Sequence, residues 1–432
     1  MDKFVVEGGI PLRGEIRVSG SKNSCLPILA ATILSDGECV IHRVPRLRDV
    51  ETMVDILRDL GVDAQWEGEG TLRTIVRDAS KVKAPYERVR TMRASFCVLG
   101  PLVARRGKAV VSLPGGCVIG VRPVDLHLKG LKALGAEVVS EAGYVMAESP
   151  KLTGRELFLG GAFGSSVTGT ANVMMAATLA KGTTVIENAA CEPELADLGD
   201  FLTRMGAKIH GAGTHRVVIE GVEKLHGAET TVIPDRIETG TYMVAAAATV
   251  GDVRIRDCRP DHLGALIDKL GEAGIAVEHD ANSVRVIGPK RYRAVHVTTL
   301  PYPAFPTDLQ AQMMALLATA DGISVITERI YPDRFMHVPE LIRMGADIIK
   351  EGPNALIHGI PELHGAPVMA SDLRASAALV IAALSARGTT DVLRVYHIDR
   401  GYERIDIKLA GLGARIQRAE DVRGGAGVGE GE

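Results

Sequence analysis

The strongest constraint on the fold of this chain is a sixfold internal repeat, marked by two series of glycines. In the first series each glycine separates a small-residue stretch from a run rich in β-branched residues: Gly37, Gly107, Gly182, Gly251, Gly322 and Gly388. The second series follows in step: Gly61, Gly135, Gly206, Gly274, Gly345 and Gly413. Spacings run from 66 to 75 residues in the first series and from 68 to 74 in the second. Two series in register predict six repeated units.

Each unit follows the order strand, helix, strand, helix, strand, strand. The first helix is apolar all round, as in VMMAATLA and YMVAAAATV, which indicates a helix buried inside a domain. The second helix is amphipathic, for example over residues 49–60, and the glycine after it fits a left-handed C-cap. Aromatic residues make up only 4% of the chain, so small aliphatic residues must fill the cores. We expect an α/β protein with apolar helices inside and sheets outside.

Six units in 432 residues exceed what one hydrophobic core normally holds, so we expect two domains of three units each. A strand-like segment at 4–18 precedes the first buried helix, and a similar segment near 231–234 precedes the fourth. The first strand can therefore complete the C-terminal domain. We predict one domain from 1–20 plus 232–419, a second from 21–231, and a disordered Gly-rich tail at 420–432.

Composition excludes several functional classes. The formal net charge is −3, from 50 Lys and Arg against 53 Asp and Glu, which gives no overall reason to expect a nucleic-acid or membrane partner. The N-terminus lacks a signal-peptide pattern and no apolar run is long enough to span a bilayer, so we expect a cytoplasmic protein. Neither the six cysteines nor the twelve histidines show metal-ligand spacing, and no nucleotide-binding glycine motif is present. We expect reduced thiols, no metal and no cofactor.

The segments that enter the buried helices carry cations in unusual positions. Lys22, Arg93 and Arg374 lie at helix starts, where a positive charge opposes the helix dipole and therefore needs an anionic partner. That partner is either an anionic ligand or a protein carboxylate. The hydroxyl residues of these segments, and Asp235, are more simply interpreted as N-caps.

A second set of candidates follows the strand after each buried helix. Cys117 lies among three glycines and two prolines in PGGCVIGVRPVDLH, which indicates a mobile loop before a helix. Arg122 and the helix start could favour its thiolate, so an acid, base or nucleophile is as plausible as an inert thiol. The other five cysteines lie in or beside apolar segments, where a buried inert thiol is the default. Glu192, Arg334 and Arg400 occupy corresponding positions, and converging arginines suit a phosphate or carboxylate ligand.

Six motifs together identify a resemblance: SGSKNS at 19–24, TMRAS at 91–95, PGGCVIGVRPVDLH at 114–127, FPTD at 305–308, DLRAS at 372–376 and HIDRGYER at 397–404. From about residue 1 to 418 the chain resembles the UDP-N-acetylglucosamine enolpyruvyltransferases of the enolpyruvyl transferase superfamily. The resemblance implies an EPSP synthase-like fold, a two-domain inside-out α/β barrel with six βαβαββ repeats, three per domain. The repeat count from the glycines agrees with it.

The resemblance also implies an activity. Members transfer the enolpyruvyl group of phosphoenolpyruvate to the 3′-hydroxyl of UDP-N-acetylglucosamine and release phosphate, the first committed step of peptidoglycan synthesis, and so serve the cell wall, cell shape and cell division. It gives Cys117 the roles of general acid and of the thiol that fosfomycin alkylates. Asp308 matches the base near the attacking hydroxyl. Lys22, Arg122 and Arg400 match the phosphoenolpyruvate clamp, with Arg93 and Arg374 nearby.

For the nucleotide sugar, the resemblance points to Asn23, Arg93, Pro123, Val124, Asp125, Leu126, Ser166, Val167, Asp308 and Ile330. Thr168 stands where the family often has glycine beside the diphosphate, which puts the backbone contact there in question, and Arg334 and Asp372 complete the candidate set. Ligand binding is expected to close the hinge between the domains, and a monomer is expected. Two alternatives stay open: an enolpyruvylshikimate-phosphate synthase, and a non-catalytic nucleotide-sugar binding module.

Overall fold

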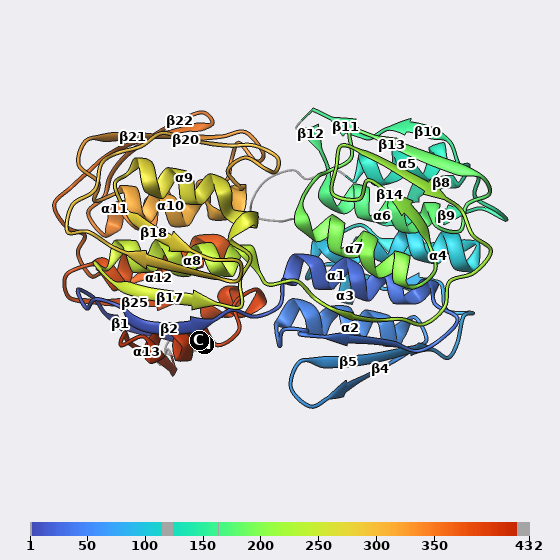
Figure 1. Ribbon diagram of the computed structural model, residues 1–432, viewed down its shortest axis with the longest axis horizontal. Coiled ribbons are helices and arrows are strands. Elements are labelled where there is room, and N and C mark those ends of the chain that lie inside the picture. Colours follow the sequence, from blue (N-terminus) through green and yellow to red (C-terminus); the bar gives the residue numbers. More distant parts are fainter. Residues whose placement is uncertain (1, 115–123, 163, 421–432) are drawn as a thin grey trace, which may run out of the picture. The chain divides into compact units, whose positions relative to one another are not determined.

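The computed structural model describes residues 2–114, 124–162 and 164–420 and divides the chain into two units (Figure 1). Unit 1 comprises Met1–Val18, Arg236–Leu300 and Ala304–Glu432, and unit 2 comprises Ser19–Asp235 and Pro301–Pro303. The expected tail at 420–432 lies, apart from Glu420, outside the described residues.

Unit 2 contains three four-stranded sheets that surround buried helices. The strand orders are β16 (Glu229–Thr231), β3 (Cys39–His42), β5 (Thr71–Val76), β4 (Val62–Glu67); β6 (Lys83–Ala84), β7 (Lys108–Ser112), β9 (Tyr144–Glu148), β8 (Glu137–Glu141); and β10 (Glu156–Phe158), β13 (Thr183–Glu187), β15 (Arg216–Glu220), β14 (Lys208–His210). The inner helices are α1 (Lys22–Ala31), α4 (Leu99–Arg106) and α6 (Val167–Ala177). The amphipathic helices are α2 (Arg48–Asp59), α5 (Asp125–Ala133) and α7 (Pro193–Arg204). Short elements complete the unit: η1 (Thr32–Leu34), α3 (Tyr86–Val89), η2 (Arg93–Val98), β11 (Gly160–Gly161) and β12 (Gly164–Ser165).

Unit 1 repeats this architecture. Its strand orders are β18 (Ala276–His279), β19 (Ser283–Ile287), β17 (Asp252–Arg256), β2 (Arg13–Arg17); β20 (Val297–Thr299), β21 (Ile323–Glu328), β23 (Asn354–His358), β22 (Asp347–Glu351); and β24 (Val368–Met369), β25 (Thr389–Leu393), β1 (Asp2–Glu7), β26 (Arg415–Glu420). The inner helices are α8 (Arg236–Ala248), α10 (Gln310–Leu317) and α12 (Leu373–Ser385). The others are η3 (Pro260–Leu263), α9 (Gly264–Glu272), η4 (Thr307–Leu309), α11 (Val338–Arg343), η5 (Val395–Arg400) and α13 (Ile405–Gly411).

The expected arrangement of helices inside and sheets outside is confirmed in both units. Every residue of α10 is buried, as are twelve of the thirteen residues of α8. Around α4, α6, α10 and α12, the preceding strand of the four-stranded sheet pairs parallel with the strand after the helix, as β6 and β7 illustrate. The next pairs in each sheet are antiparallel, as β7, β9 and β8 show. Each of these four helices therefore crosses over between two parallel strands and places its start near their ends.

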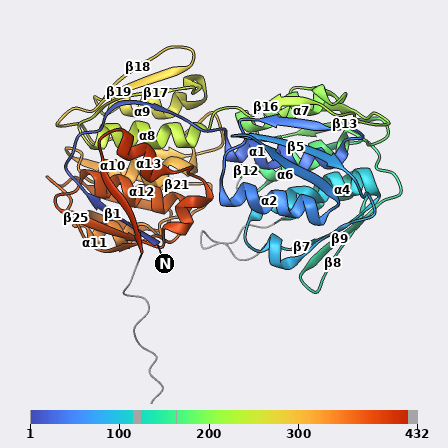
Figure 2. The ribbon, with the colours of Figure 1, turned by 90° about the horizontal axis from the view of Figure 1, so that it is seen from below.

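Two strands near the N-terminus complete sheets of unit 1. β2 precedes α1 of unit 2 in the chain but pairs parallel with β17, whereas β16, which precedes α8, pairs parallel with β3. β1 lies between β25 and β26, and Figure 2 shows it beside β25. The sequence pattern predicts one strand-like segment at 4–18. The structure instead has two strands that join two different sheets.

The repeat glycines serve two physical purposes. All six glycines of the second series have φ between +78° and +101°, which confirms the left-handed C-caps. In the first series Gly37 and Gly251 lack a positive φ. A Cβ on Gly251 would lie 2.6 Å from the carbonyl oxygen of Leu12, and one on Gly37 would lie 3.0 Å from the nitrogen of Gly227. Both are therefore sites of close backbone approach, next to the exchanged strands β2 and β16.

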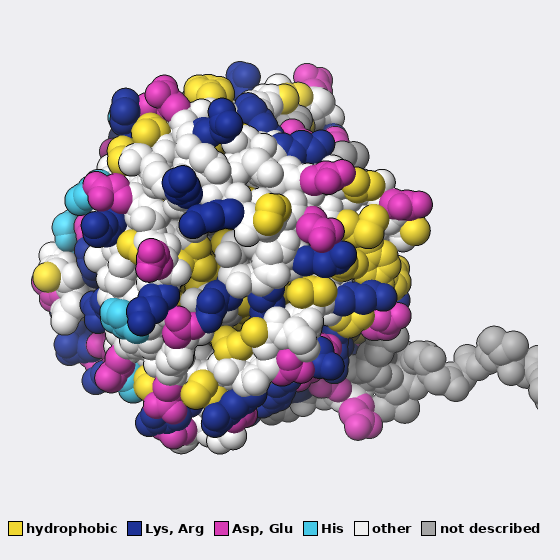
Figure 3. Space-filling view, turned by 90° about the vertical axis from the view of Figure 1, so that its right-hand side faces the viewer, with side chains coloured by type: hydrophobic (Ala, Val, Ile, Leu, Met, Phe, Trp, Pro, Cys, Tyr) yellow, Lys and Arg dark blue, Asp and Glu magenta, His cyan; other side chains and the backbone are white. Residues whose placement is uncertain are grey.

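The outer surface of unit 2 carries mixed charge. Figure 3 shows Lys and Arg side chains interspersed with Asp and Glu, without a continuous field of one sign. Ion pairs between exposed side chains, such as Lys108 with Glu148 at 3.3 Å, contribute to this pattern. Within the described residues, no helix has the length and apolar character needed to cross a membrane.

Candidate active site

A largely buried cluster of charge in unit 1 surrounds Asp308 in η4. Arg334 Nη1 lies 2.8 Å from Asp308 Oδ1, and Arg374 Nη2 lies 3.0 Å from Oδ2. The guanidinium groups are buried, with side chains 6% and 2% exposed, whereas the Asp308 side chain is 25% exposed. The carboxylate is thus paired with two buried cations while its own side chain stays partly exposed. Two guanidinium groups favour its ionised form, which can accept a hydrogen bond from a hydroxyl.

Local sequence explains how the three residues meet. Asp308 and Arg374 lie at the starts of consecutive buried helices, and Arg334 follows β21 in the same repeat as Asp308. Asp372 is the N-cap of α12, because its Oδ1 accepts hydrogen bonds from the backbone nitrogens of Arg374 (2.8 Å) and Ala375 (3.2 Å). The candidate site residue Asp372 therefore caps the helix that carries Arg374.

Electrostatics keeps Arg334 charged although it is buried. Burial alone would lower the pKa of Arg334, but the negative charges of Asp308 and Asp372 outweigh it, and the pKa lies above its ordinary value. Arg334 Nη1 also donates to Thr307 Oγ1 at 3.0 Å. The guanidinium group thus fixes both the side chain of Asp308 and the residue before it.

A buried carboxylate organises the neighbouring loop. Glu328, the last residue of β21, is fully buried and accepts hydrogen bonds from Thr299 Oγ1 (2.6 Å) and Thr307 Oγ1 (2.9 Å). It also accepts from the backbone nitrogens of Ile330 (2.8 Å) and Tyr331 (3.0 Å). Ile330, expected at the nucleotide sugar, is thereby tied to the start of η4. Arg400 ends η5 in the same unit and is half-buried.

In unit 2, Lys22 is the first residue of α1 and has a protein carboxylate as partner. Its Nζ lies 3.2 Å from Asp49 Oδ2, with side chains only 11% and 5% exposed. The backbone nitrogen of Lys22 donates to Asp235 Oδ2 at 3.1 Å, so Asp235 supports the start of α1. Of the two partners that the sequence left open for Lys22, the structure shows a protein carboxylate.

The start of α6 is organised by neutral groups. Ser166 is its N-cap and accepts from the nitrogen of Gly169 at 3.1 Å. Thr168 Oγ1 lies 3.2 Å from Nε2 of buried His127, and His127 Nδ1 lies 2.9 Å from Asn172 Nδ2. Burial and, to a smaller extent, the charge of Arg93 lower the pKa of His127 to about 3. The imidazole is therefore neutral, and the side chain of Thr168 is directed to α5.

The remaining predicted residues are distributed over the helix starts of unit 2. Val124 is the N-cap residue of α5, Asp125 is exposed on its first turn, and Leu126 is buried. The half-buried residues are Asn23, Arg93, Ser166 and Val167. Cys117, Arg122 and Pro123 lie outside the described residues.

The described cysteines match the expectation of inert thiols. Cys25, Cys39, Cys97 and Cys258 are buried, Cys191 is partly buried, and none of these five forms a disulfide. Burial raises the pKa of Cys97 to about 12 and also raises the pKa of Cys25. Among the residues that the structure describes, no three His, Cys, Asp or Glu side chains gather as a metal site.

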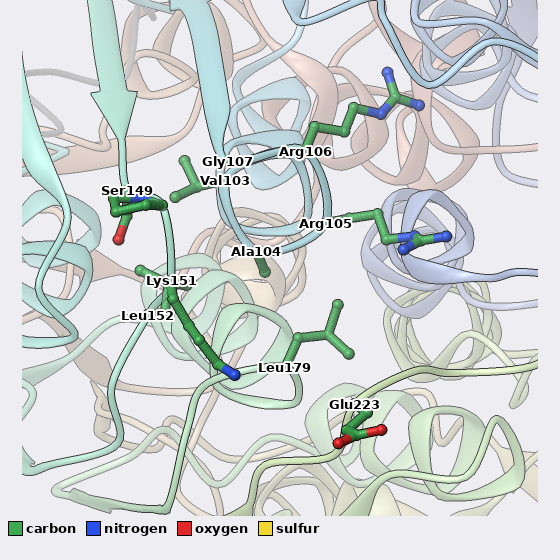
Figure 4. Close-up of a pocket in the computed structure, with 11 residues that line it drawn as sticks. Val103, Ala104, Arg105, Arg106, Gly107, Ser149, Lys151, Leu152, Leu179 and Glu223 are labelled. Carbon is green, nitrogen blue, oxygen red and sulfur yellow. The ribbon is translucent and has the colours of Figure 1, made fainter.

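A hollow of about 490 Å³ in unit 2 lies away from these helix starts. It is lined by Val103, Ala104, Arg105, Arg106, Gly107, Ser149, Pro150, Lys151, Leu152, Leu179 and Glu223, around the C-terminal ends of α4 and α6 (Figure 4). Arg105 pairs with Asp36, and Arg106 donates to the carbonyl oxygen of Leu60 at 2.8 Å. These arginines are already used by the protein, so the hollow is not the candidate site.

Sequence reasoning missed Asp49, Glu328 and Asn172. Each is a buried polar residue whose importance lies in its partners, which are 27, up to 29 and up to 76 residues away. A polar residue within an otherwise buried face is the only signal that could have indicated them.

The sequence has close relatives among known proteins. The family model described as EPSP synthase (3-phosphoshikimate 1-carboxyvinyltransferase) matches residues 6–409. The chain is 55% identical to a UDP-N-acetylglucosamine 1-carboxyvinyltransferase of Methylacidiphilum infernorum, over 97% of this chain and 99% of the relative. It is 56% identical to the protein of the same name from Anaeromyxobacter sp. (strain K), with the same coverage.

Solved structures agree on the fold. The enolpyruvyl transferase NikO from Streptomyces tendae aligns with a TM-score of 0.88 and 26% identity, over 97% of this chain and 99% of that one. EPSP synthase from Acinetobacter baumannii aligns with a TM-score of 0.75 and 19% identity, over 97% and 100%. The latter likeness concerns the fold alone.

Proposed function

Because the chain belongs to the EPSP synthase family of enolpyruvyl transferases, we propose that it transfers the enolpyruvyl group of phosphoenolpyruvate to the 3′-hydroxyl of UDP-N-acetylglucosamine and releases phosphate. The observation that carries the proposal is an identity of 53–56% over nearly the full length of relatives with that name. Identity to the EPSP synthase structures is only 19%, which makes shikimate 3-phosphate the weaker acceptor candidate.

The proposed reaction is an addition followed by an elimination. Carbon 3 of phosphoenolpyruvate gains a proton while the sugar oxygen bonds to carbon 2 and the hydroxyl proton leaves. In the second step the bond from carbon 2 to the phosphate oxygen breaks, carbon 3 loses a proton, and the enol ether and phosphate are formed. The reaction thus needs an acid at carbon 3, an acceptor for the hydroxyl proton, and cations for the phosphate and carboxylate.

Unit 1 offers the proton acceptor in this proposal. Asp308 is partly exposed and has two buried guanidinium partners, which suits a carboxylate that orients a hydroxyl and takes its proton as the new bond forms. Arg400 supplies a further cation for phosphoenolpyruvate. Arg334 acts on Asp308 rather than on substrate, because its side chain is buried beneath the carboxylate.

Unit 2 offers the acid and a phosphate ligand. Cys117 is proposed as the general acid at carbon 3 and as the thiol that fosfomycin alkylates. Lys22 and Arg122 are proposed to bind phosphoenolpyruvate, with Lys22 on a helix start that itself favours anions. For the nucleotide sugar, Asn23, Arg93, Pro123, Val124, Asp125, Leu126, Ser166, Val167, Thr168 and Ile330 remain the proposed contacts.

The proposal extends to cellular role and state. An enzyme of this specificity would supply peptidoglycan synthesis, and so cell shape and division, and we propose that it works in the cytoplasm. We propose that it acts as a monomer. Light scattering after size-exclusion chromatography tests the last point directly, because a dimer would double the measured mass.

The decisive experiment measures phosphate release from phosphoenolpyruvate with UDP-N-acetylglucosamine or shikimate 3-phosphate as acceptor. Release only with the nucleotide sugar supports the proposal, and release only with shikimate 3-phosphate would replace it with the sister activity. Fosfomycin should abolish release and add one drug adduct to the intact mass. Cys117→Ser should remove the adduct and turnover while leaving nucleotide-sugar affinity intact, whereas a pure binding module would show no turnover in any protein tested.

A further inference from the structure

A buried polar network in unit 1 connects three elements beneath the Asp308 cluster. Gln312 on α10, Thr241 on α8 and Tyr402, two residues after Arg400, are each no more than 1% exposed. Gln312 Nε2 lies 2.9 Å from the carbonyl oxygen of Asp308, 3.2 Å from Thr241 Oγ1 and 3.3 Å from Tyr402 Oη. Thr241 Oγ1 and Tyr402 Oη are 2.8 Å apart.

The hydrogen bonds of this network have a defined direction. Thr241 Oγ1 donates to the carbonyl oxygen of Ile237 at 2.8 Å, so it must accept from the hydroxyl of Tyr402. The carbonyl oxygen of Asp308 can only accept, which fixes the amide of Gln312 with its nitrogen toward Asp308. The three side chains therefore form one ordered path from α8 to the residue that bears the carboxylate.

The network also contacts the cation side of the cluster. The guanidinium carbon of Arg374 lies 5.4 Å from the centre of the Tyr402 ring, and Arg374 Nη2 binds Asp308. Tyr402 thus touches Arg374 with its ring and Gln312 with its hydroxyl. It lies in the turn that begins with Arg400 and Gly401, so its position limits where that turn can lie.

We propose that Tyr402 and Gln312 are positioning residues that hold Asp308 and the Arg400 turn of unit 1 in one fixed arrangement. This inference rests on the proposed function, because its purpose is to set the proton acceptor against a phosphoenolpyruvate ligand. A fixed spacing lowers the cost of reaching the reactive geometry, since small displacements of such groups strongly reduce rate. Neither side chain is assigned a direct contact with substrate.

The first test replaces Tyr402 by Phe, which keeps the ring and removes only the hydroxyl. We expect kcat for phosphate release to fall about 5- to 10-fold, the order of one lost hydrogen bond. The KM for UDP-N-acetylglucosamine should stay within twofold, and the KM for phosphoenolpyruvate should rise because the Arg400 turn is less constrained. An unchanged kcat would overturn the proposal.

Tyr292→Phe is the matched control. The Tyr292 hydroxyl is also buried and bonds to the carbonyl oxygen of Leu316 (2.9 Å) and to Thr319 Oγ1 (2.5 Å), at the other end of α10. Removing it should lower thermal stability as much as Tyr402→Phe does but leave kcat unchanged. Equal kinetic losses in the two variants would show a general structural effect and overturn the positioning role.

A second variant keeps the test decisive if Tyr402→Phe folds poorly. Gln312→Met preserves an unbranched side chain and removes the hydrogen bond to Asp308, so kcat should again fall. If both residues act through one network, the loss in the double variant should be smaller than the product of the single losses. If the kcat loss of the double variant equals the product of the two single losses, Tyr402 and Gln312 are not coupled. Asp308→Asn and the natural protein separate the two levels. If Asp308→Asn retains kcat, Asp308 is not the proton acceptor and the positioning role fails with it, whereas a natural protein that releases no phosphate with UDP-N-acetylglucosamine would refute the proposed function itself.

Discussion

The two units hold the charges of their candidate site residues in different ways. In unit 1, both oxygens of the Asp308 carboxylate face guanidinium groups, so three full charges depend on one another. In unit 2, Lys22 pairs with Asp49, and the nearby start of α6 is fixed by neutral side chains, His127 and Asn172. We therefore expect the activity that depends on Asp308 in unit 1 to be lost when a charge is removed. We expect the hydrogen-bonded pair of His127 and Asn172 in unit 2, called the neutral pair below, to affect stability instead.

The largest effect should come from the centre of the charged cluster. Asp308→Asn keeps the shape of the side chain but removes the proton acceptor, so kcat should fall by about 10²- to 10⁴-fold in the phosphate-release assay. The exposed Asp321 in the same unit provides the control, and Asp321→Asn should retain kcat. A loss smaller than threefold for Asp308→Asn would show that the carboxylate takes no part in proton transfer.

A substitution in the neutral pair of unit 2 should lower the free energy of unfolding. Asn172 is fully buried, accepts from the nitrogen of Gly100 and donates to the carbonyl oxygen of Phe96 at 3.2 Å. Asn172→Leu leaves both backbone groups buried, which should cost about 3 kcal/mol in the free energy of unfolding measured with urea. The exposed Gln65 serves as control, and Gln65→Ala should stay within about 0.5 kcal/mol. Equal losses of unfolding free energy in Asn172→Leu and Gln65→Ala would contradict the stabilising role of Asn172.

Removing the charge of Lys22 should weaken the use of phosphoenolpyruvate but not the binding of the nucleotide sugar. Lys22→Met removes one charge-assisted bond, so kcat/KM for phosphoenolpyruvate should fall about 10- to 100-fold. Nucleotide-sugar affinity, measured by calorimetry, should change little. Lys181→Met, at an exposed lysine of the same unit, controls for loss of a positive charge. A larger loss of nucleotide-sugar affinity than of kcat/KM would place Lys22 at the other substrate.

The smallest effect should appear in the pH dependence of stability. It comes from two buried, neutral histidines of the described residues, His127 in unit 2 and His337 in unit 1. Burial lowers the pKa of His127 to about 3 and that of His337 to about 4. Below about pH 6.5 the unfolded chain binds protons that the folded chain does not, so stability falls as pH decreases. At pH 5.5 each histidine should cost about 1.4 kcal/mol relative to neutral pH.

His127→Gln and His337→Gln test this point separately in the two units. Urea unfolding at pH 7.5 and pH 5.5 should show a smaller difference in each variant than in the natural chain. Below pH 4 the contribution of His337 stops growing, while that of His127 continues to about pH 3. If neither variant reduces the difference, the histidines are protonated in the folded state.

Much of the fold could be predicted because local constraints repeat. Apolar stretches such as the one in α8 can only be buried, and a glycine after each amphipathic helix marks a left-handed cap. The exchange of β2 and β16 was harder, because each strand pairs with a partner far along the chain, as Arg13 with Asp252 and Glu229 with Val40. The sequence pattern therefore indicated a strand near the N-terminus but not its division between two sheets.

The candidate site could be predicted from motifs only in part. Lys22 and Arg374 were recognisable because cations oppose the dipole at helix starts, and both have carboxylate partners. Glu328 was not recognisable, because its position at the end of β21 reads as an exposed turn, whereas the alternation of the strand places it inward with Ser324 and Ile326. Two of its hydrogen-bond donors, Thr299 and Thr307, come from segments that only folding brings beside it.

The strand exchange has a consequence for synthesis of the chain. Unit 2 contains every strand of its own sheets between residues 19 and 235, so it can fold as soon as that segment leaves the ribosome. β1 and β2 are made first but must wait for β17, β25 and β26, the last of which ends at Glu420. β2 therefore stays unpaired until β17 is made, and β1 stays unpaired during almost all of translation, with strand edges that the nascent chain must protect from aggregation.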